Sequence, residues 1–349
     1  MRREFAEYDV TMARAKKILS ERLTLGGIFK REAEKLGVKL LLDPEWQVVG
    51  QITTRDGRRR YFKTMSLDLN TQGAAAVAND KDFAAYFLKK MGYPVPESQS
   101  FHSDNWRKQI GSKQDWRKAS VYAHKLGYPV IVKPNSKSQG KGVRLVYSQK
   151  ELVQAIREIF TYDRIALVQK PVQGRDYRVV ILDGKIISAY ERIPLSVTGD
   201  GRSTILQLLN KKQSVFRENG RDTKIKLSDA RIKAKLQYQG RALGTIPARN
   251  ERIFLLDNAN LSSGGDAVDV TENMHPEWKK LAARIAKDMN LRFTGIDVIV
   301  ESDLSKPPKN YVVLEVNDSP GLDNYAAIGP AQKKIVENLY RSVLIAMTR

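Results

Sequence analysis

The most constraining stretch of the sequence spans residues 295–322, where three oxygen-bearing side chains interrupt two apolar runs rich in β-branched residues. Such runs predict two β-strands separated by a variable loop. Side chains two residues apart on a strand share a face, so Glu315 and Asn317 point the same way, and Asp297 joins them if the strands pair. Two carboxylates and one amide oxygen suit a hard cation such as Mg2+, which takes its remaining ligands from water and phosphates. On spacing alone, the alternative that all three are solvated polar positions of ordinary strands stays open.

The surrounding composition limits the class of protein. With 349 residues and no cysteine, the chain is long enough for two or three lobes and has no disulfide, thiolate nucleophile or cysteine-ligated zinc. No apolar run reaches the length of a membrane-spanning helix, and charged residues at the start replace the apolar core of a signal peptide. We therefore expect a cytoplasmic protein without a membrane partner. His102, His124 and His275 lie far apart and are expected to be surface or capping residues.

The net charge of +21 is high, and residues 211–253 carry much of it, with twelve Lys or Arg against four Asp or Glu. A basic surface attracts polyanions such as nucleic acid, acidic peptides or nucleotides. No helix-turn-helix, zinc-finger or aromatic–basic RNA-binding pattern accompanies the charge. Nucleic acid is therefore the less favoured partner, and the alternative that the charge serves only solubility stays open.

The first 78 residues are expected to form a short N-terminal lobe. Two short basic helices are predicted over residues 11–36, with a break at Gly26-Gly27. Three strands follow, with predicted ranges Lys39–Asp43, Trp46–Thr54 and Arg60–Met65. Beyond this lobe, Asn79-Asp80 offers an N-cap to a helix whose apolar residues recur at helical spacing.

A loop of small residues, Asn135–Gly142, lies between two predicted strands. The first strand, Tyr128–Pro134, places Lys133 at its end, and the second covers Val143–Tyr147. Such a loop can close its backbone N–H groups over phosphates while lysines add positive charge. Neither of the two common glycine-rich phosphate motifs is present. Taken alone, such a loop is more often an ordinary hairpin turn.

The second half of the chain alternates strands, turns and helices. Asp183-Gly184 is a strong two-residue turn signal and predicts a hairpin. Residues 213–250 are basic and weakly patterned, and Asn258–Gly265 is rich enough in Asn, Ser and Gly to predict a loop. The predicted strands are Arg164–Lys170, Asp176–Leu182 and Lys185–Arg192, and the predicted helices are Lys150–Phe160, Ile205–Lys212, Pro276–Met289 and Ala331–Met347.

Taken in order, these segments resemble the ATP-grasp superfamily of carboxylate–amine ligases over residues 79–325. The segments that carry the resemblance are Asp80-Lys81, Gly92–Pro96, Tyr128–Pro134, the small-residue loop, Val168–Gly174 and the trio Asp297, Glu315 and Asn317. Other segments resemble the ATP-grasp module of cyanophycin synthetase and of the bifunctional glutathione synthetases in particular. These are Tyr190–Ile205, Asn258–Thr271 with His275-Pro276, and Thr294–Asp297.

The resemblance implies an α+β fold in which ATP lies between two α+β subdomains. The implied division is a short N-terminal lobe over residues 1–78, a small lid subdomain over 79–167, and a C-terminal subdomain over 168–349 with the metal and substrate sites. It also implies an ADP-forming ligase that uses ATP and Mg2+, with Mn2+ as an alternative ion.

The resemblance also assigns roles to individual residues. The residues implied to contact ATP are Lys81, Lys133, Ser138, Gly140, Gly142, Gln169, Lys170, Val172 and Asp176. Of these, Lys81 and Lys133 would contact phosphates and Asp176 would contact the ribose. The implied metal ligands are Asp297, Glu315 and Asn317. The catalytic candidates are Arg178 and Arg192, for a substrate carboxylate or acylphosphate, and Lys141, for a phosphate.

Two positions depart from the superfamily's usual residues. Gln169 stands where Glu is usual, and Gly295 stands where D-alanine ligases carry an arginine, which argues against that subfamily. The expected substrates are amino acids or peptides, acidic ones among them, and relatives often form homo-oligomers. The open alternatives are a ligase that modifies a peptide or protein tail, as RimK-like and peptide-macrocyclising enzymes do, and a nucleotide-binding protein without catalysis.

Overall fold

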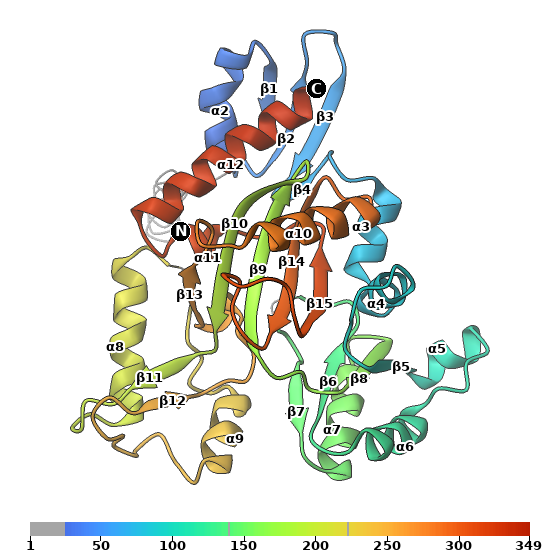
Figure 1. Cartoon of the computed structure of the whole chain (residues 1–349), viewed down its shortest axis with the longest axis vertical. Coiled ribbons are helices and arrows are strands. Elements are labelled where there is room, and N and C mark those ends of the chain that lie inside the picture. Colours follow the sequence, from blue (N-terminus) through green and yellow to red (C-terminus); the bar gives the residue numbers. More distant parts are fainter. Residues whose placement is uncertain (1–24, 139, 222) are drawn as a thin grey trace, which may run out of the picture.

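The computed structural model of the chain describes residues 25–138, 140–221 and 223–349, so the helix predicted before residue 25 lies outside the described residues. Four antiparallel β-sheets and the helices around them confirm the α+β class (Figure 1). Within these ranges, no helix combines the length and apolar character that crossing a bilayer requires.

A five-stranded sheet lies at the centre, in the order β13-β10-β9-β14-β15. Its strands are β9 (Arg175–Leu182), β10 (Lys185–Ile193), β13 (Asp266–Asp269), β14 (Phe293–Val300) and β15 (Tyr311–Asn317). Asp183 and Gly184 join β9 to β10 with φ angles of 48° and 75°, as a two-residue hairpin turn requires, so the predicted hairpin is confirmed.

The two faces of the central sheet pack against different helices. One face meets α3 (Gln72–Asn79), α4 (Lys81–Lys90) and α10 (Pro276–Asp288) in one hydrophobic core. The opposite face meets α11 (Asp323–Ala326) and α12 (Pro330–Thr348) in a second core. Along β9, Tyr177 and Val179 enter the first core and Val180 enters the second. Because strand side chains alternate, Arg178 lies on the face of the second core, beyond its apolar part.

The N-terminal lobe packs on α12 at one end of the central sheet (Figure 1). Its elements are α2 (Leu25–Leu36), β1 (Lys39–Leu42), β2 (Val49–Thr53), β3 (Arg59–Lys63) and β4 (Ser66–Leu67). The predicted helix break at Gly26-Gly27 is wrong, because α2 runs through both glycines. Gly26 packs against the backbone of Gln47 and leaves no room for a Cβ atom, so this glycine permits close packing and does not end a helix.

The lid subdomain, residues 98–169, lies beside the other end of the central sheet (Figure 1). Its sheet has the order β5-β8-β6-β7, and two helices cover a core that includes Val132, Ile156 and Val168. The elements are β5 (Ser98–His102), α5 (Asp104–Gln109), α6 (Trp116–Leu126), β6 (Val130–Pro134), β7 (Arg144–Val146), α7 (Gln149–Ile159) and β8 (Ile165–Gln169).

The insertion subdomain, residues 195–256, leaves the central sheet after β10 and has its own core around Leu209, Ile232 and Leu255. Its elements are β11 (Ser196–Thr198), α8 (Ile205–Glu218), α9 (Ala230–Tyr238) and β12 (Arg252–Phe254), and the short helix η1 (Leu261–Ser263) follows it. Helix α8 continues six residues beyond the predicted end. The three-part division of the chain at residues 78 and 167 stays a prediction.

Candidate active site

A cleft of about 1200 Å³ lies where the lid subdomain, the central sheet, the insertion subdomain and the chain after β15 meet. A volume of this size exceeds that of typical small-ligand pockets and leaves room for more than one substrate. The predicted site residues that line it are Lys81, Lys133, Ser138, Gly140, Gln169, Val172, Asp176, Arg178, Arg192, Asp297, Glu315 and Asn317.

The three predicted metal ligands lie on one face of a strand pair. Strands β14 and β15 are antiparallel, with Asp297 directly opposite Glu315 and Gly295 opposite Asn317. Directly paired residues share a face of the sheet, and so do residues two apart on one strand. The predicted strand pairing is therefore confirmed, and all three side chains face the cleft.

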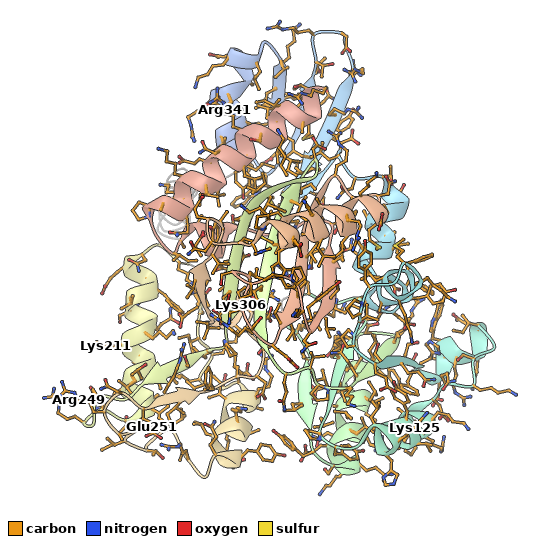
Figure 2. All side chains as sticks on the ribbon, in the orientation of Figure 1. Lys125, Lys211, Arg249, Glu251, Lys306 and Arg341 are labelled. Atoms are coloured by element: carbon orange, nitrogen blue, oxygen red, sulfur yellow. The ribbon has the colours of Figure 1, made fainter. Side chains whose placement is uncertain are left out.

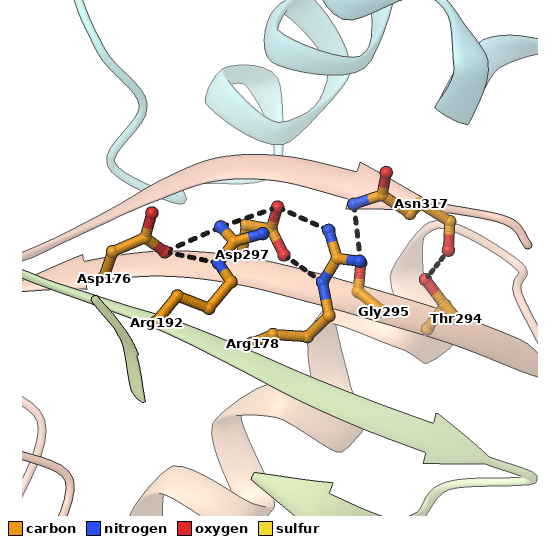
Figure 3. Close-up of polar contacts among 7 residues, drawn as sticks. All are labelled: Asp176, Arg178, Arg192, Thr294, Gly295, Asp297 and Asn317. Carbon is orange, nitrogen blue, oxygen red and sulfur yellow. Dashed lines mark hydrogen bonds and ion pairs between the residues drawn. The ribbon is translucent and has the colours of Figure 1, made fainter. Parts of the chain in front are cut away.

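Asp297 lies buried between two arginines, as Figure 3 shows. Arg178 Nε and Nη2 each donate to its carboxylate at 2.7 Å, and Arg192 Nη2 lies 3.0 Å from Oδ2. Burial alone would raise the pKa of Asp297, but the two guanidinium groups hold it below its usual value. Asp297 therefore stays ionised.

Arg192 also binds Asp176, the predicted ribose ligand. Its Nε and Nη2 atoms donate to Asp176 Oδ1 at 3.0 and 2.6 Å. Burial raises the pKa of Asp176, and Arg192 opposes that rise. The result is a row of alternating charges in the cleft, Asp176–Arg192–Asp297–Arg178, in which Arg192 and Asp297 are buried and the two outer residues are half-buried.

The two predicted phosphate-binding lysines flank the same strand pair. Lys81 follows Asp80, which confirms its predicted capping role by accepting from Phe83 N at 2.9 Å. Lys81 Nζ lies 3.0 Å from Glu315 Oε1 and donates to Lys137 O at 2.8 Å. Lys133 is buried, and burial lowers its pKa to about 8, with Lys81 adding to the shift and Glu315 opposing it.

The donor set fits a hard cation. Asn317 Nδ2 donates to Gly295 O at 3.2 Å, so this bond does not engage its side-chain oxygen. No group of three His, Cys, Asp or Glu side chains within the described ranges is arranged to hold a metal ion, so Asp297 and Glu315 are the two carboxylates of the predicted set. The cationic partners of Asp297 and Glu315 show that this pair of carboxylates collects positive charge.

The small-residue loop approaches the cleft from the lid subdomain. Gly140 has a φ of 69°, and a methyl group there would overlap the amide nitrogens of Asn258 and Asn260. Three predicted site residues lie outside the cleft lining. Lys141 Nζ lies 5.5 Å from the Tyr162 ring centroid, Gly142 packs against Tyr162 and Pro134, and Lys170 donates its backbone N–H to Glu97 O at 2.9 Å.

Several cleft residues were not predicted from the sequence. Lys137, Tyr190, Asn258, Asn260 and Asn324 all line the cleft. The two asparagines lie in a segment whose Asn, Ser and Gly content predicted only a loop. A glycine-rich loop that also carries adjacent amide side chains was the available signal for a binding loop, but spacing alone does not say what the amides face.

Two family models match separate parts of the chain. The model described as the C-terminus of D-ala D-ala ligase matches residues 87–200, and the RimK-like ATP-grasp domain matches residues 243–339. The first covers the lid subdomain and the β9–β10 hairpin, and the second covers β14, β15 and the three predicted metal ligands. Both matches therefore include walls of the cleft.

Curated relatives give the same assignment. The chain is 33% identical over 308 residues to cyanophycin synthetase of Trichormus variabilis, covering 85% of this chain and 32% of that protein. It is 32% identical over 285 residues to the glutathione biosynthesis bifunctional protein GshAB of Streptococcus mutans serotype c, covering 77% of this chain and 36% of that protein. The chain thus spans about a third of the length of these relatives.

One solved structure has the same fold over most of the chain. The bifunctional glutathione synthetase from Pasteurella multocida superposes with a TM-score of 0.56 at 23% identity, covering 91% of this chain and 44% of that one. The expected ATP-grasp fold is therefore confirmed. From the matched domains, the relatives and this fold, we conclude that the chain belongs to the ATP-grasp superfamily.

Proposed function

We propose that the protein is an ATP-dependent ligase that joins the carboxylate of an amino acid or peptide to an amine and releases ADP and phosphate. One observation carries the proposal: Lys81 and Lys133 face the strand pair of Asp297, Glu315 and Asn317 across a single cleft. Such a set of charges suits phosphoryl transfer, in which catalysis is mainly positioning and charge neutralisation. The matched cyanophycin synthetase and glutathione biosynthesis proteins support this reaction class.

The proposed reaction has two steps. A carboxylate is a poor electrophile, so its oxygen first attacks the γ-phosphorus of ATP, which forms an acylphosphate and releases ADP. The amine nitrogen then attacks the acyl carbon, phosphate leaves, and the nitrogen loses a proton as the amide or isopeptide bond forms. Exclusion of water by the lid subdomain would protect the acylphosphate from hydrolysis.

The cleft residues take the following proposed roles. Lys81 and Lys133 bind phosphates, and Gln169, Val172 and the Lys170 backbone meet adenine, with Asp176 at the ribose. Asp297, Glu315 and Asn317 would hold Mg2+, or Mn2+ in its place, which neutralises phosphate charge when bound. Arg178 and Arg192 then orient the substrate carboxylate and offset the charge that develops on the acylphosphate.

Product analysis tests this reaction class. Purified protein is incubated with ATP, Mg2+ and a panel of amino acids and short peptides, and nucleotides are separated by chromatography. We expect ADP and phosphate in equal amounts, and release of AMP and pyrophosphate would overturn the proposal. Glu315→Gln should abolish turnover, whereas Glu301→Gln, an exposed position just after β14, should not. ATP binding without turnover in any substrate mixture would favour a non-catalytic nucleotide-binding protein.

A specific observation favours a peptide or protein tail as the substrate. The insertion subdomain exposes basic side chains that form no ion pair with a described residue, and Figure 2 shows Lys211 and Arg249 at its outer edge. Among these residues are Lys211, Lys224, Lys226, Lys233 and Arg249. Such a surface would attract an acidic peptide by long-range electrostatics.

A charge-reversal experiment separates a peptide substrate from a free amino acid. Lys211→Glu combined with Lys233→Glu should raise KM for an oligoglutamate peptide and leave KM for ATP unchanged. Lys125→Glu, on the lid subdomain in Figure 2, is the control. An unchanged KM for the peptide would remove the insertion subdomain from substrate binding.

A further inference from the structure

The segment Asn258–Gly265 is a tightly fixed wall of the cleft. Asn260 O accepts from Ser263 N at 3.0 Å and from Gly265 N at 3.2 Å, and Gly264 has a φ of 96°. A Cβ atom at Gly265 would lie 2.6 Å from Ile193 O and 3.0 Å from Asn260 O. The two glycines therefore allow the segment to fold back on itself and on the end of β10, with its amide side chains beside the cleft.

A buried arginine from the insertion subdomain holds this segment. Arg221 is 8% exposed, and its Nη2 donates to Leu261 O and, at 2.7 Å, to Gly265 O. Its guanidinium carbon also lies 4.0 Å from the Phe216 ring centroid. No ion pair joins Arg221 to any carboxylate that the structure describes. A buried cation is costly when its hydrogen-bond partners are neutral, and the charge of nearby Asp266 offsets only part of this cost, so the bonds of Arg221 to these carbonyls hold the segment in place.

The same arginine reaches a second cleft segment through Thr223. Arg221 Nε donates to Thr223 Oγ1 at 3.1 Å, and Thr223 Oγ1 lies 2.9 Å from its acceptor, Asn324 Oδ1. Asn324 lines the cleft in α11, seven residues after the predicted metal ligand Asn317. Arg221 and Thr223 thus connect the Asn258–Gly265 segment to the chain that leaves β15.

The amide side chains of this segment face the small-residue loop. The nitrogens of Asn258 and Asn260 lie directly against Gly140, and Asn258 Nδ2 is buried without a hydrogen bond to any residue in the described ranges. A buried donor without a partner is unusual and calls for an acceptor. In a cleft that transfers a phosphoryl group, a neighbouring carboxylate would supply that acceptor.

We infer that Asn258–Gly265 binds the acid substrate, with the amides of Asn258 and Asn260 donating to its carboxylate, and that Arg221 is the positioning residue for this wall. This inference rests on the proposed ligase function and adds the side of the cleft on which the acid lies. The proposed nucleotide contacts come from α4, the lid subdomain and the central sheet, and they meet the proposed acid site where Gly140 touches Asn258 and Asn260.

Kinetics with a trapping nucleophile test the acid-binding role. The full chain is assayed with ATP, Mg2+, hydroxylamine as the amine and one acid at a time, beginning with L-glutamate and L-aspartate, and hydroxamate is measured. Asn258→Ala and Asn260→Ala should each raise KM for the acid at least about ten-fold, because each removes one hydrogen bond to a charged group. KM for ATP should stay within about two-fold. An increase confined to KM for ATP would overturn the inference, because the segment would then be a nucleotide wall.

Hydrogen exchange tests the positioning role without relying on activity. Arg221→Met should speed exchange of the amides at residues 258–265 and around Asn324 while the Kd of Mg2+-bound AMP-PNP stays unchanged. Thr223→Val should do so around Asn324 and at Leu261, whose carbonyl lies 3.2 Å from Thr223 Oγ1, and should leave the rest of residues 258–265 unchanged, which keeps the test valid if Arg221→Met fails to fold. The matched control is Arg202→Met, an exposed arginine of the same subdomain outside the basic stretch. Unchanged exchange in both variants overturns the positioning role.

The two proposals can fail separately. If the unmodified protein forms no hydroxamate with any acid, the proposed function and the acid-binding role are overturned, and the exchange result still decides the role of Arg221.

Discussion

At the scale of single residues, Asp297 is a buried carboxylate held by two guanidinium groups. The carboxylate is 2% exposed and is bound by Arg178 and Arg192. Taking a carboxylate out of water is costly, and only close partners of opposite charge offset that cost. Arg178 consequently depends on Asp297 for its charge balance in the fold, whereas Arg192 shares its charge between Asp297 and Asp176.

Replacing Asp297 should therefore lower stability as well as activity. Asp297→Asn removes the carboxylate that both guanidinium groups share, so that Arg178 keeps no ion pair with a described residue while Arg192 keeps Asp176, and we expect unfolding to become easier by about 3–5 kcal/mol. Urea denaturation followed by circular dichroism measures this change. Asp303→Asn is the matched control, because its ion pair with Arg175 spans 3.8 Å at the surface and should contribute less than about 1 kcal/mol. A loss of activity at full stability would show that the arginines find other partners.

Lys133 predicts a pH dependence of stability. Its pKa in the fold is about 8, against 10.5 in its ordinary state, so the unfolded chain binds more protons between these values. The free energy of unfolding of the unmodified protein, minus that of Lys133→Met, should therefore rise with pH. The expected rise is about 2 kcal/mol from about pH 7.5 to about pH 10. Denaturation midpoints of both proteins across this range give the difference. A flat difference would mean that Lys133 is not desolvated in the absence of nucleotide.

Gly140 combines a backbone requirement with a steric one. Gly140→Ala should raise KM for ATP several-fold, because φ is 69° and the new methyl group would overlap Asn258 and Asn260. Steady-state kinetics against ATP measure the effect. Gly111→Ala is the control, since Gly111 has a φ of 67° with open space around it and should cost only backbone strain of about 1 kcal/mol. Equal effects of both variants would show that contact with the two asparagines is unimportant.

Some residue-level features follow from the sequence and others do not. The shared face of Glu315 and Asn317 follows from the two-residue period of a strand. The pairing of Asp297 with Arg178 joins residues 119 positions apart, and nothing local in the sequence selects that arginine among many. Burial of Arg221 against neutral carbonyls was equally hidden, because it lies in a stretch whose basic composition indicated a solvated surface.

At the scale of elements, α9 of the insertion subdomain closes against the lid subdomain. Tyr238 donates its hydroxyl to Glu151 Oε1 at 2.8 Å, and its ring centroid lies 4.2 Å from that of Tyr147. Arg231 Nη1 donates to Gly140 O at 3.1 Å. Helix α9 therefore contacts both the small-residue loop and the start of α7, on the outer rim of the cleft.

Weakening this rim contact should speed the release of nucleotide. Tyr238→Phe removes the hydrogen bond to Glu151 while keeping the ring contact, and we expect roughly two- to five-fold faster dissociation of a fluorescent ATP analogue. Stopped-flow displacement measures the rate. Tyr61→Phe, which removes the hydrogen bond from Gln51 Nε2 in the N-terminal lobe, should leave it unchanged. An unaltered rate in Tyr238→Phe would mean that the lid subdomain opens elsewhere.

Element boundaries were predictable where a cap or turn signal was strong. Asp80, the Asp183-Gly184 turn and the His275 cap of α10 lie where the sequence placed them. Helix α9 was missed because basic residues obscure its apolar positions, of which only Ile232 and Leu236 are buried. The position of Gly26 inside α2 was not predicted, because it depends on a close contact with Gln47, which lies outside the helix.

At the scale of the whole molecule, α12 joins the N-terminal lobe to the central sheet. Its residues Tyr340 and Leu344 share one core with Phe29 of α2, Phe62 of β3 and Val180 of β9. The first and last described elements therefore pack on each other. We expect the N-terminal lobe and the central sheet to unfold together.

A core substitution in α12 tests this cooperativity. Leu344→Ala should destabilise the protein by about 2–5 kcal/mol and shift a single transition, because a fully buried leucine leaves a cavity. Differential scanning calorimetry measures the change. Leu41→Ala, at a 68% exposed position of β1, should change stability by less than about 0.5 kcal/mol. A separate early transition in Leu344→Ala would show that the lobe unfolds independently.

The overall arrangement was predictable only through the resemblance. Alternating strands and helices indicate an α+β class, but the order β13-β10-β9-β14-β15 brings together strands from distant parts of the chain. The period of side chains fixes which face a strand buries and not which strand lies next to it. The separate core of the insertion subdomain was likewise unpredicted, since residues 213–250 lack a strong apolar pattern.

That separate core makes residues 195–256 a module that can vary on its own. Substitutions around Leu209 and Leu255 alter the packing of this module without touching either core of the central sheet. Because Arg221 extends from it to the wall formed by Asn258–Gly265, such changes would reach the acid side of the cleft first. Exchange of this module between homologous chains is therefore a direct route to altered acid preference with the nucleotide machinery preserved.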